Sequence, residues 1–170
     1  TLKFYKENWL EVGYLNKKHK QEFYEKGKSY LLGFLKNAYD KKINTIAIEQ
    51  KFNFKLSQDL KIGGTIDRID DLGNGKYEIV DYKTGANIPS QKEVDNDLQL
   101  SVYAMAVSSI YKVDPGDISL SLYYLDTQEK FTTKRTKKDL EKVKSEISEV
   151  RNEIENSDFK CNNNYFCQNK

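Results

Sequence analysis

The spacing of hydrophobic residues changes along the first half of the chain, and the change predicts two kinds of element. Between positions 17 and 39, apolar side chains recur at helical spacing, which predicts an amphipathic helix. From 44 to 56 they alternate with polar residues, as in a half-buried strand, and further strands are predicted at about 60–70 and 76–83. The first forty residues are therefore predicted to be helical and the next forty to form three antiparallel strands.

The second half of the chain repeats the helix-then-strand pattern. A helix is predicted at about 92–111, and "DPGD" at 114–117 ends it. Two strands follow at 118–126 and 129–135, before a last helix. This order predicts an α/β fold with a mixed β-sheet of about five strands flanked by helices.

The last predicted helix carries a narrow apolar stripe on a charged surface. It starts at Thr136, and Asp139 three residues later completes a pattern that resembles a capping box. We expect a surface helix that packs on the sheet rather than a coiled coil with a partner. The stripe consists of Leu140, Val143, Ile147, Val150 and Ile154.

Composition limits the class of protein without naming a function. The chain has 170 residues, 38% hydrophobic and 32% charged, which predicts one soluble globular domain over 1–170. We see neither a membrane span nor a signal peptide. Two cysteines do not make a disulfide framework, so we expect a reducing, cytoplasmic setting. Because the sequence starts at Thr1 rather than Met, we also expect a fragment of a longer protein.

Charge alone neither favours nor excludes nucleic acid as a partner. The formal net charge is +2, and the basic residues are almost all lysine. Lysines attract phosphates as point charges, whereas arginines offer the bidentate forks that read bases. The only arginines are Arg68, Arg135 and Arg151.

One stretch places unusual charges at a strand end. In "VDYKTG", residues 80–85, Asp81 and Lys83 point to the same face of a predicted strand. The preceding strand carries "GGTIDRID", and "DLGNG" between them has hairpin chemistry. If a three-residue loop is centred on Asn74, paired positions sum to 148 and Asp67 faces Asp81. The two carboxylates and the ammonium would then converge on one face.

A different register would separate these charges. A two-residue turn of Asn74 and Gly75 gives pairs that sum to 149, and a one-residue slip moves side chains to the other face. We prefer the first register because it also matches Ile69 with Ile79, although a bulge could reconcile the two. Two close carboxylates repel unless a cation lies between them, and Mg²⁺ or Mn²⁺ suits such oxygen ligands. A solvated Asp–Lys bridge is the alternative interpretation.

Three motifs in order resemble a known family. "GGTIDRID", "VDYKTG" and, at 99–104, "QLSVYA" closely resemble the PD-(D/E)XK nuclease superfamily. The similarity is greatest to RecB-type nuclease domains, which are often joined to the C-terminus of superfamily 1 (UvrD/Rep-like) DNA helicases. It is strong over about 44–111 and weak in the flanking helices.

The resemblance implies a restriction-endonuclease-like core and a metal-dependent deoxyribonuclease that serves DNA repair or recombination. It implies Mg²⁺ or Mn²⁺ as cofactor, and DNA and a helicase/ATPase domain as partners, with no membrane. The implied catalytic and metal-binding residues are Asp67 and Asp81 as metal ligands, the Tyr82 carbonyl as a further ligand, Lys83 as catalytic lysine, and Gln99 and Tyr103 as residues that support the site and contact the nucleic-acid backbone.

Three further motif residues have less specific roles. Glu49 matches a glutamate found frequently in the family, and it could help to hold the metal or bridge a nearby lysine. Arg68 and Asp70 point to the other face, where we expect an internal salt bridge.

The sequence departs from the family pattern in two places, and the first departure favours an alternative function. The family's usual histidine ligand has no match, because His19 lies in the lysine-rich "NKKHKQEF" and is expected to be a solvated surface residue. Cys161 and Cys167 are too few for the four-cysteine iron–sulfur cluster of many relatives, so such a cluster is not expected here. The alternative is a catalytically weak or inactive nucleic-acid-binding or scaffold domain on the same fold.

Overall fold

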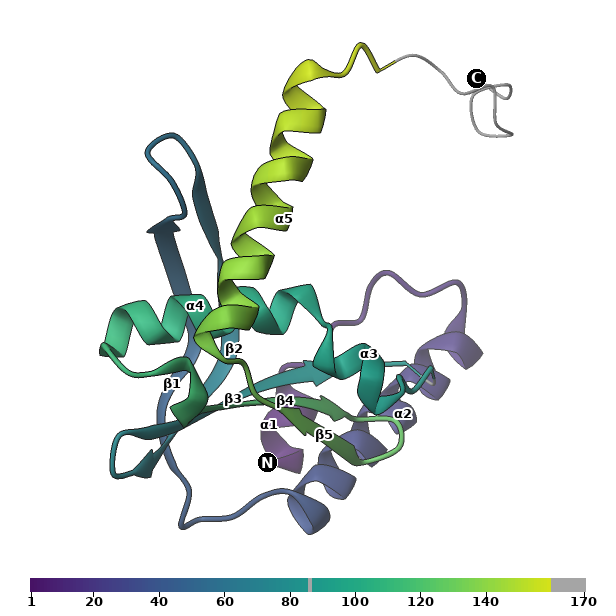
Figure 1. The fold of residues 1–170 in the computed structure, drawn as a ribbon. Coiled ribbons are helices and arrows are strands. Elements are labelled where there is room, and N and C mark those ends of the chain that lie inside the picture. Colours follow the sequence, from purple (N-terminus) through teal and green to yellow (C-terminus); the bar gives the residue numbers. More distant parts are fainter. Residues whose placement is uncertain (86, 160–170) are drawn as a thin grey trace.

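A five-stranded mixed sheet forms the centre of the molecule in a computed structural model, which describes residues 1–85 and 87–159 (Figure 1). The strands lie in the order β1-β2-β3-β4-β5, with β3 and β4 parallel and every other neighbouring pair antiparallel. This arrangement confirms the predicted mixed sheet. The strands are β1 (Asn44–Lys55), β2 (Lys61–Gly73), β3 (Lys76–Lys83), β4 (Ile118–Tyr124) and β5 (Glu129–Thr133).

Helices lie on both faces of the sheet (Figure 1). They are α1 (Leu2–Glu7), α2 (Lys17–Asn37), α3 (Gln91–Asp95), α4 (Leu98–Tyr111) and α5 (Lys137–Asn156), with a 3₁₀ turn, η1 (Pro115–Asp117). On one face, Phe34 of α2 packs edge-on against Tyr82 and Tyr123 of the sheet. On the other face, α4 packs against β1 and β4. In the described residues, no helix is both long and apolar enough to cross a membrane.

Two predicted helices are each divided in the structure. The prediction of a single helix at 92–111 is wrong. Helix α3 ends at Asp95, and α4 begins at Leu98, with Asp97 as its N-cap residue. The Asp97 side chain accepts a hydrogen bond from Leu100 N at 2.8 Å, which caps the first turn of α4. The helical first forty residues likewise consist of α1 and α2 with an irregular segment between them.

The hydrophobic core lies between the sheet and α4. Ile69, Ile79 and Leu120 have no exposed surface, and α4 covers them with Ala104 and Val107, which are equally buried. The strand residues share one face because side chains alternate along a strand. Asp81 and Lys83 follow Ile79 at two-residue steps, so the core side of the sheet continues directly into the charged strand end.

The β2–β3 hairpin combines the two registers considered from the sequence. Gly73 pairs with Lys76 around a two-residue Asn74–Gly75 turn, in which both residues have positive φ. A bulge then shifts the pairing, so that Ile69 faces Ile79 and Arg68 faces Val80. The three-residue loop was therefore wrong, but the preferred register of the strands is confirmed.

Helix α5 does not lie on the sheet as the sequence predicted. Its first half packs against α4 and buries Leu140, with Val143 and Ile147 partly buried against the same core. Its second half extends away from the sheet (Figure 1), where Val150 is 53% and Ile154 is 54% exposed. The apolar stripe is thus covered only over its first half by the residues described.

Candidate active site

The two motif aspartates lie where β2 and β3 separate. The antiparallel ladder between these strands ends at Arg68 and Val80, one residue before Asp67 and Asp81. Beyond that point the Asp67 side chain replaces the missing main-chain partner, because its Oδ2 accepts a hydrogen bond from Tyr82 N at 2.9 Å. Both carboxylates therefore lie just beyond the end of the ladder.

Asp81 is a buried carboxylate with incomplete compensation. It is 3% exposed, and its Oδ2 has no hydrogen-bond partner among the described residues, although Lys83 Nζ lies 2.7 Å away as an ion pair. Burial raises the pKa of Asp81, Lys83 opposes the rise, and the charge of Asp67 adds to it. The site therefore holds an excess of negative charge that an additional cation would stabilise.

Lys83 is held from a second side by α4. Its Nζ donates to Gln99 Oε1 at 2.7 Å, and Gln99 Nε2 donates to the hydroxyl of Tyr103 at 2.7 Å. That hydroxyl donates in turn to the carbonyl of Thr65 at 2.9 Å. Because a carbonyl can only accept, the chain of bonds has one direction and keeps the Gln99 oxygen toward Lys83.

The hydroxyl of Tyr103 remains a donor at ordinary pH. Burial raises its pKa to about 12, and the charges of Asp81 and Asp67 act in the same direction. Phe52 packs edge-on against the Tyr103 ring, with centroids 5.9 Å apart. A side chain at Gly64 would place its Cβ 2.9 Å from the Phe52 ring, so the glycine of "GGTIDRID" leaves room for this support.

The turn after Lys83 is fixed by a residue that the sequence did not single out. Asp126 accepts a hydrogen bond from Gly85 N at 2.6 Å and pairs with Lys26 of α2 at 3.0 Å. Gly85 has φ +133°, a conformation that favours glycine. Asp126 follows the end of β4, and its proximity to "KTG" depends on the parallel pairing of β3 with β4, which no sequence signal announces.

The reverse face of the same strands carries the internal salt bridge expected from the sequence. Arg68 binds Asp70 with two parallel bonds, Nε to Oδ1 at 2.8 Å and Nη2 to Oδ2 at 2.7 Å. Thr45 donates to the same carboxylate at 2.7 Å, and Arg68 Nη1 donates to the hydroxyl of Tyr82 at 3.0 Å. Asp70 has no exposed surface. The side chain of Tyr82 thus lies on this reverse face, where it contacts Arg68, and its backbone N–H contacts Asp67 at the site.

The remaining predicted residues are placed differently. Glu49 is exposed and has φ +50°, and the ladder pairs on either side of it place its backbone across from Asp67. His19 is partly buried rather than fully solvated. The centroids of its ring and the Phe23 ring are 4.6 Å apart, and its Nδ1 accepts a hydrogen bond from Leu15 N at 3.3 Å. Cys161 and Cys167 lie outside the described residues.

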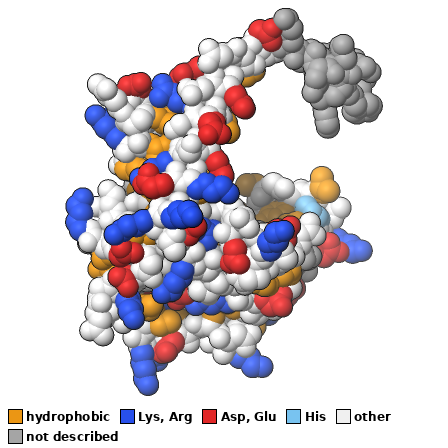
Figure 2. Space-filling view, viewed as in Figure 1, with side chains coloured by type: hydrophobic (Ala, Val, Ile, Leu, Met, Phe, Trp, Pro, Cys, Tyr) orange, Lys and Arg blue, Asp and Glu red, His pale blue; other side chains and the backbone are white. Residues whose placement is uncertain are grey.

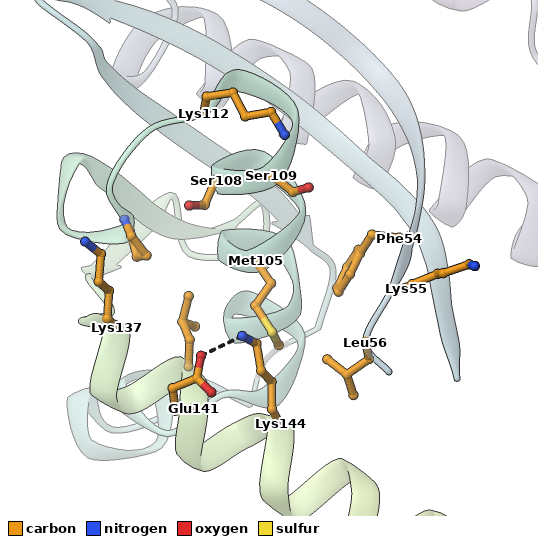
Figure 3. A pocket seen from close by; sticks show the side chains of 12 residues that line it. Phe54, Lys55, Leu56, Met105, Ser108, Ser109, Lys112, Lys137, Glu141 and Lys144 are labelled. Carbon is orange, nitrogen blue, oxygen red and sulfur yellow. Dashed lines mark hydrogen bonds and ion pairs between the residues drawn. The ribbon is translucent and has the colours of Figure 1, made fainter. Parts of the chain in front are cut away.

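A separate groove lies away from this site. A groove of about 430 Å³ lies between the end of β1, the second half of α4 and the first half of α5 (Figure 3). Phe54, Leu56 and Met105 lie around it, and Lys144 pairs with Glu141 at 2.6 Å on its α5 side. None of the aspartates, Lys83, Gln99 or Tyr103 lines it. On the face shown in Figure 2, basic and acidic side chains are intermixed.

The donor set at the strand ends fits a hard divalent cation. Asp67 has one oxygen engaged by Tyr82 N, and the buried Oδ2 of Asp81 has no hydrogen-bond partner in the described chain beyond its ion pair with Lys83. Mg²⁺ is commonly bound by one or two carboxylates and completes its shell with water. Over residues 1–85 and 87–159, no group of three or more His, Cys, Asp or Glu side chains gathers for a metal. The fit therefore rests on two carboxylates.

Comparisons with known proteins agree with this geometry. The chain is 35% identical over 106 residues to a subunit of an "ATP-dependent helicase/deoxyribonuclease" from Streptococcus mutans, a match that covers 61% of this chain and 10% of that protein. It is 32% identical over 108 residues to the protein of the same name from Streptococcus agalactiae, covering 62% of this chain and again 10% of the relative. The chain thus spans about a tenth of the length of these curated relatives.

Fold and family are supported by two further matches. The crystal structure of SSO0001 superposes with a TM-score of 0.50 at 17% identity, over 82% of this chain and 70% of the other, which is a likeness of fold. The model of the PD-(D/E)XK nuclease superfamily matches residues 4–169. Since that match spans nearly the whole sequence and the sheet has the restriction-endonuclease-like arrangement, this chain belongs to the PD-(D/E)XK nuclease superfamily.

Proposed function

We propose that this chain is a metal-dependent deoxyribonuclease domain that hydrolyses phosphodiester bonds. The observation that supports the proposal most directly is the buried Asp81 carboxylate, which has one oxygen without a hydrogen bond and lies beside Lys83 at the open end of the β2–β3 ladder. An acid whose pKa is raised by burial, next to a base at a strand end, is typical of catalytic sites.

Asp67, Asp81 and the carbonyl of Tyr82 would hold the metal. Bound there, Mg²⁺ or Mn²⁺ would lower the pKa of a water molecule and polarise a phosphoryl oxygen. Glu49 is a candidate for a further ligand because its backbone lies across from Asp67. The left-handed backbone of Glu49 is unusual for a residue other than glycine, and such strain is often found at functional sites.

Lys83 would act on the reacting phosphate. An ammonium group has three donors. One donates to Gln99 Oε1, and the Asp81 carboxylate lies 2.7 Å from the ammonium as an ion pair. The side chain is 32% exposed, so the ammonium can also donate to a phosphate oxygen or to the attacking water. A charge fixed in advance stabilises the negative charge that grows in the transition state. Gln99 would keep the ammonium in place, and Tyr103 would keep the amide of Gln99 from turning over.

The biological setting follows from the relatives, and we extend it to this chain as part of the proposal. The relatives are named as subunits of a helicase/deoxyribonuclease. We infer that DNA is the substrate and that a helicase or ATPase domain is the partner. We also infer a role in DNA repair or recombination and a cytoplasmic location.

One observation favours the alternative, a domain that binds nucleic acid with little or no cleavage. Only two carboxylates gather at the site within the described residues, and no histidine joins them. Such a domain would bind DNA and leave it intact when Mg²⁺ or Mn²⁺ is added.

A cleavage assay separates the two functions. The chain is incubated with fluorescent single- and double-stranded DNA in Mg²⁺, Mn²⁺ or EDTA, together with the variants Asp81→Asn and Lys83→Ala. We expect cleavage by the parent in either metal, and a loss of roughly 10²-fold or more in each variant.

A matched control is available on the same strand. Lys76 of β3 is exposed at the far end of the hairpin, so Lys76→Ala should cleave like the parent. Equal cleavage by the parent and Lys83→Ala would contradict the proposed role of the lysine. DNA binding without cleavage by the parent would support the alternative.

A further inference from the structure

A buried arginine far along the chain holds the helix that carries Gln99. Arg135 lies between β5 and α5 and is 3% exposed. All five of its N–H donors are used. Its partners are Ser101 Oγ at 2.8 Å, Thr133 Oγ1 at 3.0 Å, the Lys134 carbonyl at 3.0 Å, and the carbonyls of Val94 and Asp97, both at 3.1 Å.

Three of these partners frame the start of α4. Val94 belongs to α3, Asp97 caps α4, and Ser101 lies in its first turns. Ser101 Oγ accepts from Arg135 Nε and donates to the carbonyl of Asp97 at 2.9 Å, and that carbonyl also accepts from Arg135 Nη2. The bonds close a ring that fixes both the position of the helix along its axis and its rotation.

Gln99 lies between Asp97 and Ser101 in the sequence but on the opposite side of the helix from these two partners of Arg135. At 3.6 residues per turn, Asp97 and Ser101 are about 40° apart around the axis, and Gln99 is roughly 200° from Asp97. Tyr103 is one turn beyond Gln99 on the same side. Gln99 itself is exposed and has little packing to hold it. Rotation of α4 would therefore move the Gln99 oxygen away from Lys83.

Burying the charge of Arg135 costs desolvation free energy that a purely structural contact does not require. Its hydrogen-bond partners are neutral oxygens, and burial lowers its pKa from the ordinary value while Asp97, Asp95 and Asp139 oppose that change. Apolar packing could join the same elements without burying a charge. A planar fork with five donors, in contrast, fixes orientation in a way that neither apolar contacts nor a lysine can reproduce.

We propose that Arg135 is a positioning residue for Lys83, acting through α4 and Gln99. This inference rests on the proposed nuclease function for its catalytic consequence. Arg135 does not touch the reacting atoms in this scheme. It sets the distance between Gln99 Oε1 and Lys83 Nζ, which is 2.7 Å in the structure.

The kinetic test compares Arg135→Lys with a destabilised control. We expect Arg135→Lys to lower kcat by about tenfold to a hundredfold with little change in KM, because misplacement of a catalytic group by about 1 Å has effects of this size. Leu140→Ala removes a buried side chain that packs α5 against α4 and makes none of the side-chain hydrogen bonds of the site. Assayed below its unfolding temperature, this control should keep kcat within about twofold.

A double-substitution cycle tests the route of the effect. If Arg135 acts through Gln99, Arg135→Lys should lower kcat in the parent but should lower it no further when added to Gln99→Ala. An unchanged kcat in Arg135→Lys, or full additivity with Gln99→Ala, would overturn the inference.

A readout without catalysis keeps the inference separate from the proposed function. The side-chain NH₂ of Gln99, which donates to Tyr103, gives NMR signals that report its environment. We expect these signals to shift in Arg135→Lys and to stay in place in Leu140→Ala. If the parent fails to cleave DNA, the proposed function fails, and the NMR comparison still decides whether Arg135 positions Gln99. Unchanged signals in Arg135→Lys would overturn it.

Discussion

Two acid–base pairs sit back to back on strands β2 and β3, and they differ in how fully their charges are satisfied. Each pair is made of residues two apart on one strand, Arg68 with Asp70 on β2 and Asp81 with Lys83 on β3. Asp70 accepts three hydrogen bonds, two of them in a bidentate contact with Arg68. Asp81 is also buried, yet one of its oxygens has no hydrogen bond in the described part of the chain.

The physical consequences are opposite for the two pairs. Burial lowers the pKa of Arg68, but its hydrogen bonds to Asp70 and Tyr82 more than offset this, so the pKa lies above the ordinary value. Burial raises the pKa of Asp81, and Lys83 offsets the rise only in part. The first pair stabilises the ionised state of Arg68, whereas the second holds a charge on Asp81 that the fold disfavours. We interpret the first as structural and the second as functional.

The largest effect on stability should come from the satisfied pair. Asp70→Asn leaves Arg68 as a poorly compensated buried charge, so we expect the free energy of unfolding to fall by about 3 kcal/mol. Urea denaturation measures this as a lower midpoint at an unchanged m-value. A loss below about 1 kcal/mol would show that the bidentate contact is not structurally important and would remove the contrast between the pairs.

A smaller effect, a fall in kcat, is expected when the hydrogen bonds that hold Lys83 through Gln99 and Tyr103 are weakened. Tyr103→Phe removes the hydroxyl that donates to Thr65 and accepts from Gln99, so the amide of Gln99 loses its fixed orientation. We expect kcat to fall about tenfold, which corresponds to about 1.4 kcal/mol, in single-turnover cleavage. Tyr111→Phe is the matched control, because Tyr111 lies on the same helix and stacks on Tyr77 away from the site. Equal rates in the two variants would contradict the role of Tyr103.

The smallest effect should be a gain of stability. Asp81→Asn removes a charge that folding disfavours, and we expect the free energy of unfolding to rise by about 1 kcal/mol at pH 7 in EDTA. Because the pKa of Asp81 is raised in the folded state, the parent binds more protons folded than unfolded, and its stability rises as pH falls through that pKa. The gain should therefore shrink as pH is lowered from neutrality toward the ordinary aspartate value.

Added Mg²⁺ should reverse this difference in stability and make the parent more stable than Asp81→Asn. A cation that binds only the folded parent stabilises it, and the variant lacks the carboxylate that would hold the ion. We expect thermal unfolding of the parent to shift upward with added Mg²⁺ and that of Asp81→Asn to shift less. A variant less stable than the parent in EDTA would indicate that the Asp81–Lys83 contact is structural, like the pair on the reverse face.

Local patterns predicted much of the fold. Alternation of apolar residues located the strands, and the match of Ile69 with Ile79 selected the register that places Asp67 and Asp81 at one strand end. The details of the turn were wrong, because a bulge next to Gly73 corrects the register and a single hairpin sequence is compatible with both pairings. The break between α3 and α4 was missed because the apolar pattern continues across it. The new helix begins there because the Asp97 side chain accepts a hydrogen bond from Leu100 N and caps α4.

The sequence by itself determined which residues are candidates for the chemistry. The charges of "VDYKTG" and "GGTIDRID" stand out from their letters alone, because acids and bases are unexpected at the end of core strands. Gln99 and Tyr103 were singled out only by the resemblance of "QLSVYA" to the family. Only the tertiary structure decided which charges are satisfied and what holds them. Asp126 and Arg135 reach the site across 41 and 38 residues of chain, to Gly85 and Asp97. Contacts of that range depend on how β4, β5 and α4 pack, and no local pattern encodes them.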